Sequence, residues 1–289
     1  MISSTLYSDP ACPWAYSESP ALRVLEWRYG DQLDWRLVVI GLSEDASRYA
    51  SMGYTPLRGA LGHLSFRRFG MPFSPSPKER MSATARACRA VVAARLADPG
   101  SEWRVFRALQ LANFTTPLLL DDDAQLADAL RPLASVDADA IVASLDDPVV
   151  TEAYERDRAE ARTAAGSPSE LQGKTAASDG PVRYTAPSVV FESEGRRLEA
   201  GGFQPVEAYD VLVANLDPGV HRAPVPDSPA PLLDRFPDGV TTQEVAAMLT
   251  EGNDAPDRRA AETALLELVA AGEAERVSLG DDALWRRVS

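Results

Sequence analysis

Asp9-Pro10-Ala11-Cys12-Pro13-Trp14-Ala15-Tyr16 is the stretch of sequence that decides the fold. A short β-prone run, Ile2–Tyr7, precedes it, and Pro13 suits the first turn of a helix because its missing N–H would have no partner there anyway. Apolar residues then recur through the next turns until Gly30, and residues 34–41 are typical of a strand. The N-terminus therefore predicts strand, helix and strand, a βαβ unit.

Cys12 carries the chemistry in this stretch because it lies immediately before the predicted helix. The unpaired amide groups and the positive end of the helix dipole favour an anionic sulfur at that place. Such a position can lower a thiol pKa from ~8.5 to between ~3.5 and ~7.5. We predict a reactive thiolate at Cys12; the alternative is a small buried hydrophobic residue near a turn.

A second segment of the sequence indicates the same kind of fold. Tyr184-Thr185-Ala186-Pro187-Ser188-Val189-Val190-Phe191 reads as a loop and a strand, followed by a hairpin partner at 197–200 and a helix over 205–216. Together, the two segments resemble the DsbA family of thioredoxin-fold proteins, closest to its FrnE-like branch. That branch includes relatives of 2-hydroxychromene-2-carboxylate isomerase and of kappa-type glutathione transferase. The resemblance covers about residues 1–217.

The resemblance implies a role for each matching residue. Cys12 corresponds to the family's nucleophilic cysteine, and Pro13 and Trp14 to the pair that follows it, where they would contact substrate. Pro187 corresponds to the cis-proline that lies against the reactive sulfur, so Ala186 would offer its N–H and C=O to the substrate. The alternative for Pro187 is an ordinary trans residue at the start of a strand.

The sequence departs from the family's Cys-x-x-Cys motif, because Ala15 stands where the second cysteine is expected. A dithiol enzyme releases its mixed disulfide with that second thiol, and alanine cannot do so. This favours monothiol chemistry, in which an external thiol resolves the mixed disulfide at Cys12. Cys88, the only other cysteine, lies within a predicted helix and is expected to pack there; its sharper interpretation is a resolving thiol.

The middle of the chain, about residues 45–165, predicts an all-helical insertion. Helical patterns cover 83–96, 103–114, 122–133 and 147–165, and the acidic run 121–123 is typical of a helix N-cap. A basic stretch precedes these helices and is broken by glycine and prolines, so we expect a solvated loop or a site for an anionic thiol. Its members are Arg58, His63, Arg67, Arg68, Lys78 and Arg80.

The C-terminal part predicts a separate unit. Residues 219–232 are rich in proline and indicate a stiff linker, and residues 233–289 show helix, helix and β-hairpin, the outline of a winged helix. Thr241 and Glu244 have the spacing of a capping box. The twelve acidic residues and six arginines of this unit give a net charge of −6, so we expect packing or protein interaction and no binding to nucleic acid.

Composition excludes several classes of protein. The 289 residues carry a formal net charge of −14, which disfavours a nucleic-acid binder. Two cysteines and two histidines are too few for a disulfide scaffold or a metal site, so no metal is expected. An apolar run long enough for a membrane span and a secretory signal are both missing, and we expect a cytoplasmic protein that does not bind membranes.

These observations converge on an α/β fold: a thioredoxin-like DsbA-type domain over 1–218 with a helical insertion, a linker, and a small winged-helix-like domain. The expected function is that of a monothiol thiol–disulfide oxidoreductase acting on a small thiol or a disulfide-bearing protein. The alternatives are a thiol-cofactor-dependent transferase or isomerase, and a redox-inactive binding protein. We expect no tightly bound cofactor; the candidate partner is a low-molecular-weight thiol, glutathione- or mycothiol-like, and the candidate assembly is a homodimer.

Overall fold

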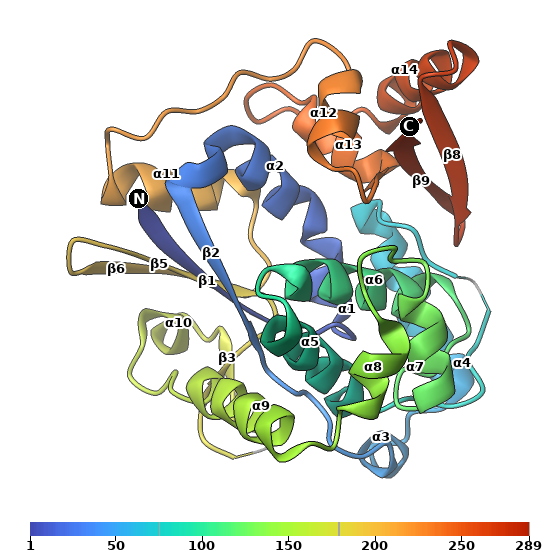
Figure 1. Cartoon of the computed structure of the whole chain (residues 1–289). Coiled ribbons are helices and arrows are strands. Elements are labelled where there is room, and N and C mark those ends of the chain that lie inside the picture. The colour runs from blue at the N-terminus through green and yellow to red at the C-terminus, as the bar shows by residue number, and fades with distance from the viewer. Residues whose placement is uncertain (75, 179, 289) are drawn as a thin grey trace.

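The computed structural model describes residues 1–74, 76–178 and 180–288, and a four-stranded sheet lies at its centre (Figure 1). The strands are β1 (Ile2–Ser8), β2 (Leu33–Val39), β5 (Ser188–Ser193) and β6 (Arg196–Gly201), in the order β2-β1-β5-β6. β1 is parallel to β2 and antiparallel to β5, and Leu6 pairs with Leu37 on one side and Val189 on the other. The sheet is therefore mixed, as in thioredoxin-like folds.

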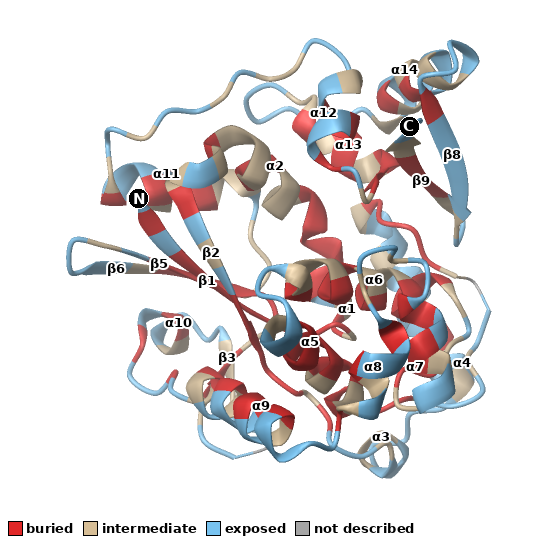
Figure 2. Ribbon diagram, viewed as in Figure 1, coloured by how far each residue is buried: buried red, intermediate tan, exposed pale blue. Residues whose placement is uncertain are grey.

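Helices cover both faces of this sheet. α2 (Ser19–Tyr29) and α11 (Val206–Leu216) lie on one face, and α9 (Pro148–Ala161) packs on β2 from the other (Figure 1). The central strands are buried along most of their length (Figure 2), because helices cover both faces of the sheet. A two-stranded ribbon, β3 (Thr175–Ala176) with β4 (Arg183–Tyr184), leads the chain back to β5.

The single helix predicted to end at Gly30 is wrong, because the structure divides it into α1 (Pro13–Ser17) and α2 at Glu18. Pro20 explains the break: it has no N–H to donate to the carbonyl of Tyr16, so the helical ladder is interrupted. The side chain of Tyr16 makes a separate contact: its hydroxyl donates to the carbonyl of Pro72, 2.8 Å away. This contact fixes α1 against the loop inside the basic stretch, between Arg68 and Lys78.

The insertion contains more helices than its sequence pattern predicts. Thr55 accepts a hydrogen bond from the amide of Arg58 and caps a helix that the loop prediction missed, because the signal of a capping residue before Pro56 was overlooked. Asp122 caps its helix as expected. In chain order the elements are α3 (Ser47–Ser51), α4 (Pro56–Phe66), α5 (Ala85–Ala97), α6 (Ser101–Thr115), α7 (Asp123–Leu130), α8 (Ala138–Ala143), α9 and α10 (Pro168–Leu171), with the short 3-10 turns Gly30–Gln32 and Arg67–Phe69.

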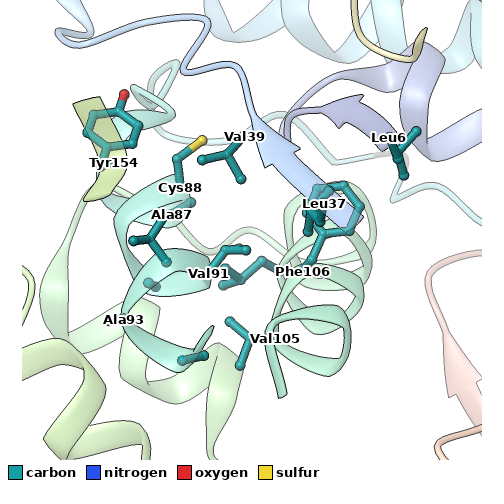
Figure 3. Close-up of a cluster of buried hydrophobic side chains, with 14 of the residues drawn as sticks. Leu6, Leu37, Val39, Ala87, Cys88, Val91, Ala93, Val105, Phe106 and Tyr154 are labelled. Carbon is teal, nitrogen blue, oxygen red and sulfur yellow. The ribbon is translucent and has the colours of Figure 1, made fainter. Parts of the chain in front are cut away.

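The largest hydrophobic cluster joins the insertion to the sheet. α5 packs on α6 and against β2, and in Figure 3 the sulfur of Cys88 lies beside Val39 while Phe106 lies beside Leu37. α5 supplies alanines, valines and one cysteine to this cluster, all with little or no exposed surface. Small side chains on α5 let the helix approach the sheet closely, and the insertion is part of one core with the thioredoxin-like domain.

The C-terminal residues fold around their own apolar cluster. Its elements are α12 (Ala230–Arg235), β7 (Val240–Thr241), α13 (Thr242–Met248), α14 (Arg258–Ala270), β8 (Ala274–Leu279) and β9 (Asp282–Arg287). The capping box at Thr241 and Glu244 is present as predicted. Val24 of α2 belongs to the same cluster, so the unit packs directly on the thioredoxin-like domain.

The turn of the C-terminal hairpin is held against the insertion. The Asp281 carboxylate accepts the amide N–H of Phe73 at 2.8 Å and pairs with Arg67. Gly280 has a φ of +58°, and a side chain there would lie 3.0 Å from the backbone of Phe73. The hairpin therefore supports the loop to which the Tyr16 hydroxyl is anchored. The backbone amide of Tyr16 in turn donates to the carbonyl of Cys12.

Candidate active site

Cys12 occupies the N-cap of α1, and its sulfur faces the loop before β5. Its Sγ donates a hydrogen bond to the carbonyl oxygen of Ala186, 3.1 Å away, and the Ala186–Pro187 peptide bond is cis. Cys12 is 6% exposed and Ala186 is 8% exposed. The structure thus brings together residues that are 174 positions apart in the chain.

Burial, and not the helix terminus, dominates the protonation of this thiol. Removal from water raises the pKa of Cys12 to about 12, and the nearby Asp9 adds to the rise. The amide groups of Ala15 and Trp14 act in the opposite direction, as the helix N-terminus should, but they are outweighed. The thiolate predicted from sequence is therefore wrong for the resting site, which holds a protonated thiol.

Asp9 is a residue of the site that the sequence does not reveal, because an Asp-Pro pair by itself indicates only a turn. The side chain is fully buried, and its two oxygens accept hydrogen bonds from the amides of Ala11 and Leu42 and from the Thr84 hydroxyl, each at 2.9 Å. Burial nevertheless raises the pKa of Asp9. Asp9 thus connects the loop before α1 with the loop after β2 and the start of α5.

Cys88 lies on the other side of the same carboxyl group. Its Sγ is 3.5 Å from Asp9 Oδ2, it has no exposed surface, and burial followed by the charge of Asp9 raises its pKa well above the ordinary value. Both cysteines are free thiols. Asp9 therefore influences both sulfur atoms, while Ala15, at the position of the missing second motif cysteine, is buried beside Cys12 in one apolar cluster.

Trp14 is the exposed part of the motif. It is 41% exposed, and its ring contacts Phe66, Phe69 and Phe203 at centroid separations of 4.9, 5.6 and 5.7 Å. Phe203 follows β6, whereas the other two phenylalanines belong to the basic stretch. The aromatic group beside Cys12 is therefore built from three separate segments, and sequence spacing alone could not assemble it. Pro13, partly buried, begins α1 between this group and Cys12.

The basic stretch contributes a small polar cavity next to the motif. The cavity has a volume of about 50 Å³, and Ala11, Tyr49, His63, Lys78 and Asn113 are among its lining residues. Lys78 Nζ donates to Asn113 Oδ1 at 3.0 Å, and burial lowers the pKa of Lys78 to about 8 and that of His63 to about 4. The prediction of a solvated loop is wrong for these two side chains, because His63 packs on Phe114 and Lys78 is held by Asn113. The four arginines of the stretch are exposed, as that prediction expects.

Comparisons with known proteins agree with this geometry. The sequence model of the family described as "DSBA-like thioredoxin domain" matches residues 5–169. The chain belongs to this family. A search among curated proteins found no match. Family membership supports the oxidoreductase fold, and the resemblance stated from the two motif segments is confirmed.

Solved structures share the fold at low sequence identity. A "probable DsbA oxidoreductase" from Streptomyces coelicolor is 18% identical with a TM-score of 0.56, covering 78% of this chain and 93% of its own. The cytosolic disulfide reductase DsbM from Pseudomonas aeruginosa is 19% identical with a TM-score of 0.51, covering 74% of this chain and 98% of its own; it was also solved with GSH. These likenesses extend the thioredoxin-like assignment from the family match to about three quarters of the chain.

The described residues contain neither a membrane-spanning helix nor a cluster of metal-binding side chains. None of the helices in the described ranges is long and apolar enough to cross a bilayer. The described His, Cys, Asp and Glu side chains form no group of three or more that could hold a metal ion. Cys12, with its neighbours Asp9, Ala186 and Trp14, is the candidate centre that the geometry leaves.

Proposed function

We propose that the protein is a monothiol thiol–disulfide oxidoreductase of the cytoplasm, with Cys12 as its nucleophile and a low-molecular-weight thiol as its reductant. The observation that carries the proposal is the placement of the Cys12 sulfur 3.1 Å from the Ala186 carbonyl, at the start of α1 and beside Pro187. A disulfide that displaces the thiol hydrogen bond could pair with the freed backbone of Ala186. The GSH bound to DsbM supports glutathione as the first thiol to test.

The proposed reaction balances in three exchanges. The Cys12 thiolate attacks one sulfur of a substrate disulfide, a Cys12–substrate disulfide forms, and the other substrate sulfur leaves as a thiolate that takes up a proton. A molecule of the small thiol then attacks this mixed disulfide, releases the second substrate thiol and becomes linked to Cys12. A second molecule of the small thiol frees Cys12 and leaves as the oxidised small disulfide. None of these exchanges requires a second thiol at the position of Ala15.

The protonated resting thiol sets the rate of the first exchange. Because the thiolate is the nucleophile and burial raises the pKa of Cys12, few molecules are competent at neutral pH. Substrate binding must therefore move the proton off the sulfur or open the site to water. The same feature makes Cys12 a selective site, since small oxidants meet a thiol in place of a thiolate.

A redox-inactive binding protein is the second candidate, and a specific observation favours it. Cys12 is almost fully buried, its thiol is protonated, and the motif lacks the second cysteine. In that case the aromatic group around Trp14 would bind a partner without any exchange at sulfur. A thiol-cofactor-dependent transferase or isomerase is the third candidate; it requires saturable binding of glutathione or a similar thiol.

The deciding experiment is turnover of 2-hydroxyethyl disulfide with glutathione, followed by coupled reduction of the oxidised glutathione. We expect turnover in the wild type, loss in Cys12→Ser, and retention in Cys88→Ala, since we propose that Cys88 packs in the core. Turnover that is equal in the wild type and Cys12→Ser would overturn the proposal. Saturable glutathione binding without turnover would favour the transferase, and neither property would favour the binding protein.

For the C-terminal unit, residues 233–289, we propose a winged-helix-like domain that supports the active site and does not bind nucleic acid. Its negative charge opposes phosphate contact. Its hairpin turn is already engaged through Asp281 and Gly280 with the loop that anchors Tyr16. Homodimer formation stays a prediction.

A further inference from the structure

A second cavity, of about 370 Å³, opens between the thioredoxin-like domain and the C-terminal unit. α2 forms one wall, the start of α11 and the segment before it form another, and α13 with the loop after it closes the third. Its lining residues include Ser17, Glu18, Phe69, Phe203, Glu207 and Asp254. The cavity shares Phe69 and Phe203 with the aromatic group around Trp14, whereas Cys12, Ala186 and Asp9 are not among its lining residues.

Two buried polar atoms at this cavity have no partner. Glu18, at the break between α1 and α2, is 1% exposed; its Oε1 accepts the Tyr209 hydroxyl at 2.7 Å and the Gln204 amide at 3.4 Å, whereas its Oε2 has no hydrogen bond. The hydroxyl oxygen of the neighbouring Ser17 is also buried without a partner. Buried polar atoms are normally paired, so two adjacent exceptions at a cavity wall indicate a ligand that supplies the missing contacts.

An aromatic wall connects the cavity with the nucleophile. Phe69 and Phe203 line the cavity, lie 4.8 Å apart between ring centroids, and both contact Trp14. Trp14 is two residues from Cys12, at the exposed edge of the motif. A substrate held at Cys12 can therefore extend over Trp14 and place its next side chains along these two rings.

The charges of the cavity select a cation. Glu207 and Asp254 lie at its rim with Glu18 in its wall, and the one arginine of the lining, Arg28, is neutralised by Asp210 at 2.6 Å. Burial raises the pKa of Glu18 to about 8, so an empty cavity holds a neutral acid there. A cation that reaches Glu18 would stabilise the carboxylate in surroundings that screen charge weakly.

We propose that this cavity binds an arginine side chain that lies close in sequence to the cysteine of the substrate disulfide. The guanidinium group supplies the donors that Glu18 and Ser17 lack, and its planar face and methylene stem suit the rings of Phe69 and Phe203. The inference rests on the proposed function for its substrate, and it adds the substrate class: disulfides flanked by arginine.

Binding to wild-type protein tests the cavity without any exchange at sulfur. The probes are blocked S-methylcysteine peptides with arginine, norleucine or glutamate placed one, two or three residues after the cysteine, measured by titration calorimetry. At the best spacing we expect the arginine peptide to bind at least about tenfold more tightly than the norleucine peptide, as charge-assisted hydrogen bonds do. We expect this preference to fall below about twofold in Glu18→Gln, which keeps an acceptor for Tyr209.

The control is Glu267→Gln, an exposed glutamate of α14 outside the cavity lining, which should keep the full preference. If Glu18→Gln does not fold, Phe203→Ala removes part of the aromatic wall and should also reduce binding of the arginine peptide. Equal binding of the arginine and norleucine peptides at every spacing would overturn the inference. Turnover of 2-hydroxyethyl disulfide is scored separately, so an arginine preference without Cys12-dependent turnover would keep the cavity and reject the proposed reaction.

Discussion

The Cys12 thiol donates its hydrogen bond to the backbone carbonyl of Ala186, so the nucleophile is tied at rest to the backbone that would receive the substrate. The sulfur proton of Cys12 and the carbonyl oxygen of Ala186 are thus both engaged in one hydrogen bond. Under the proposed reaction, a substrate that displaces this bond removes the acceptor of the sulfur proton, and the proton must leave before Cys12 can attack. Chemistry at Cys12 should therefore depend on pH in a way that an exposed cysteine does not.

Alkylation of Cys12 is expected to be slow and to rise steadily with pH. With the pKa raised to about 12, the thiolate fraction at pH 8 is smaller by about a thousandfold than for an ordinary thiol of pKa ~8.5. The rate constant with iodoacetamide, measured by mass spectrometry from pH 7 to 10 in Cys88→Ala, should show no plateau. The same protein in urea provides the ordinary rate, and a plateau near pH 8 to 9 in the folded protein would contradict the account.

Replacement of Asp9 by asparagine should make both sulfur atoms easier to ionise. Asp9 raises the pKa of Cys12 and of Cys88 through its charge, so Asp9→Asn removes that contribution while one oxygen still accepts the Ala11 amide. Alkylation of Cys12 at pH 9 should become several-fold faster. The other oxygen becomes an NH₂ group that cannot accept from Leu42 and Thr84, and unfolding free energy should fall by about 1–3 kcal/mol.

Asp34→Asn is the matched control, since this aspartate is exposed on β2. It should leave both the alkylation rate and the unfolding free energy within error of the wild type. An unchanged alkylation rate in Asp9→Asn, with the fold intact by circular dichroism, would show that burial alone holds the Cys12 proton.

The sequence predicted the sheet well because its signals are local. The β-prone runs lie within the strands, and the Asp9-Pro10 and Glu194-Gly195 turns lie directly at strand ends. β1, β2, β5 and β6 therefore follow their predicted ranges within a few residues. The break at Glu18 is not predicted by the apolar spacing, which continues through Leu22 and Leu25, although Pro20 marks the start of a new helix. α4 was missed because glycine and arginine obscure its apolar side, although Thr55 and Pro56 marked its beginning.

The site was only half predictable. Cys12, Pro13, Trp14, Ala186 and Pro187 could be named from two short motifs. Their electrostatics could not, since the pKa of Cys12 depends on burial by segments far away in the chain. The partnerless atoms of Ser17 and Glu18 likewise depend on burial by distant segments, such as Tyr209 against Glu18, which sequence spacing does not reveal.

The buried acid at Glu18 should make stability depend on pH above pH 5. Its pKa is raised from 4.5 to about 8 in the folded protein, so the stability held by the neutral form is fully present below pH 4.5 and is lost as pH rises through 8. Glu18→Gln stays neutral throughout. Urea unfolding at pH 5 and pH 9 should therefore show the variant gaining about 2–4 kcal/mol relative to the wild type at the higher pH. Parallel pH dependences of the two proteins would reject a raised Glu18 pKa.

The ion pair between Arg107 and Glu244 should decide whether the C-terminal unit stays docked. Glu244 has no exposed surface; both Arg107 amino groups donate to it at 2.7 Å, and the amide of Thr241 does so at the same distance. The pair lowers the pKa of Glu244 and joins α6 of the insertion to α13. Arg107→Ala leaves the buried carboxylate with only the more distant Arg23, 3.9 Å away, as a charged partner, and unfolding free energy should fall by about 3–5 kcal/mol.

Two further variants make the test of this ion pair specific. Arg107→Met with Glu244→Gln removes both charges, so it should recover part of the loss, because the penalty arises from the unpaired carboxylate and not from the missing attraction. Arg131→Ala breaks an exposed ion pair on the insertion and should change stability by less than about 0.5 kcal/mol. Urea unfolding followed by far-ultraviolet circular dichroism measures all three. A double variant no more stable than Arg107→Ala would reject the unpaired carboxylate as the source of the loss.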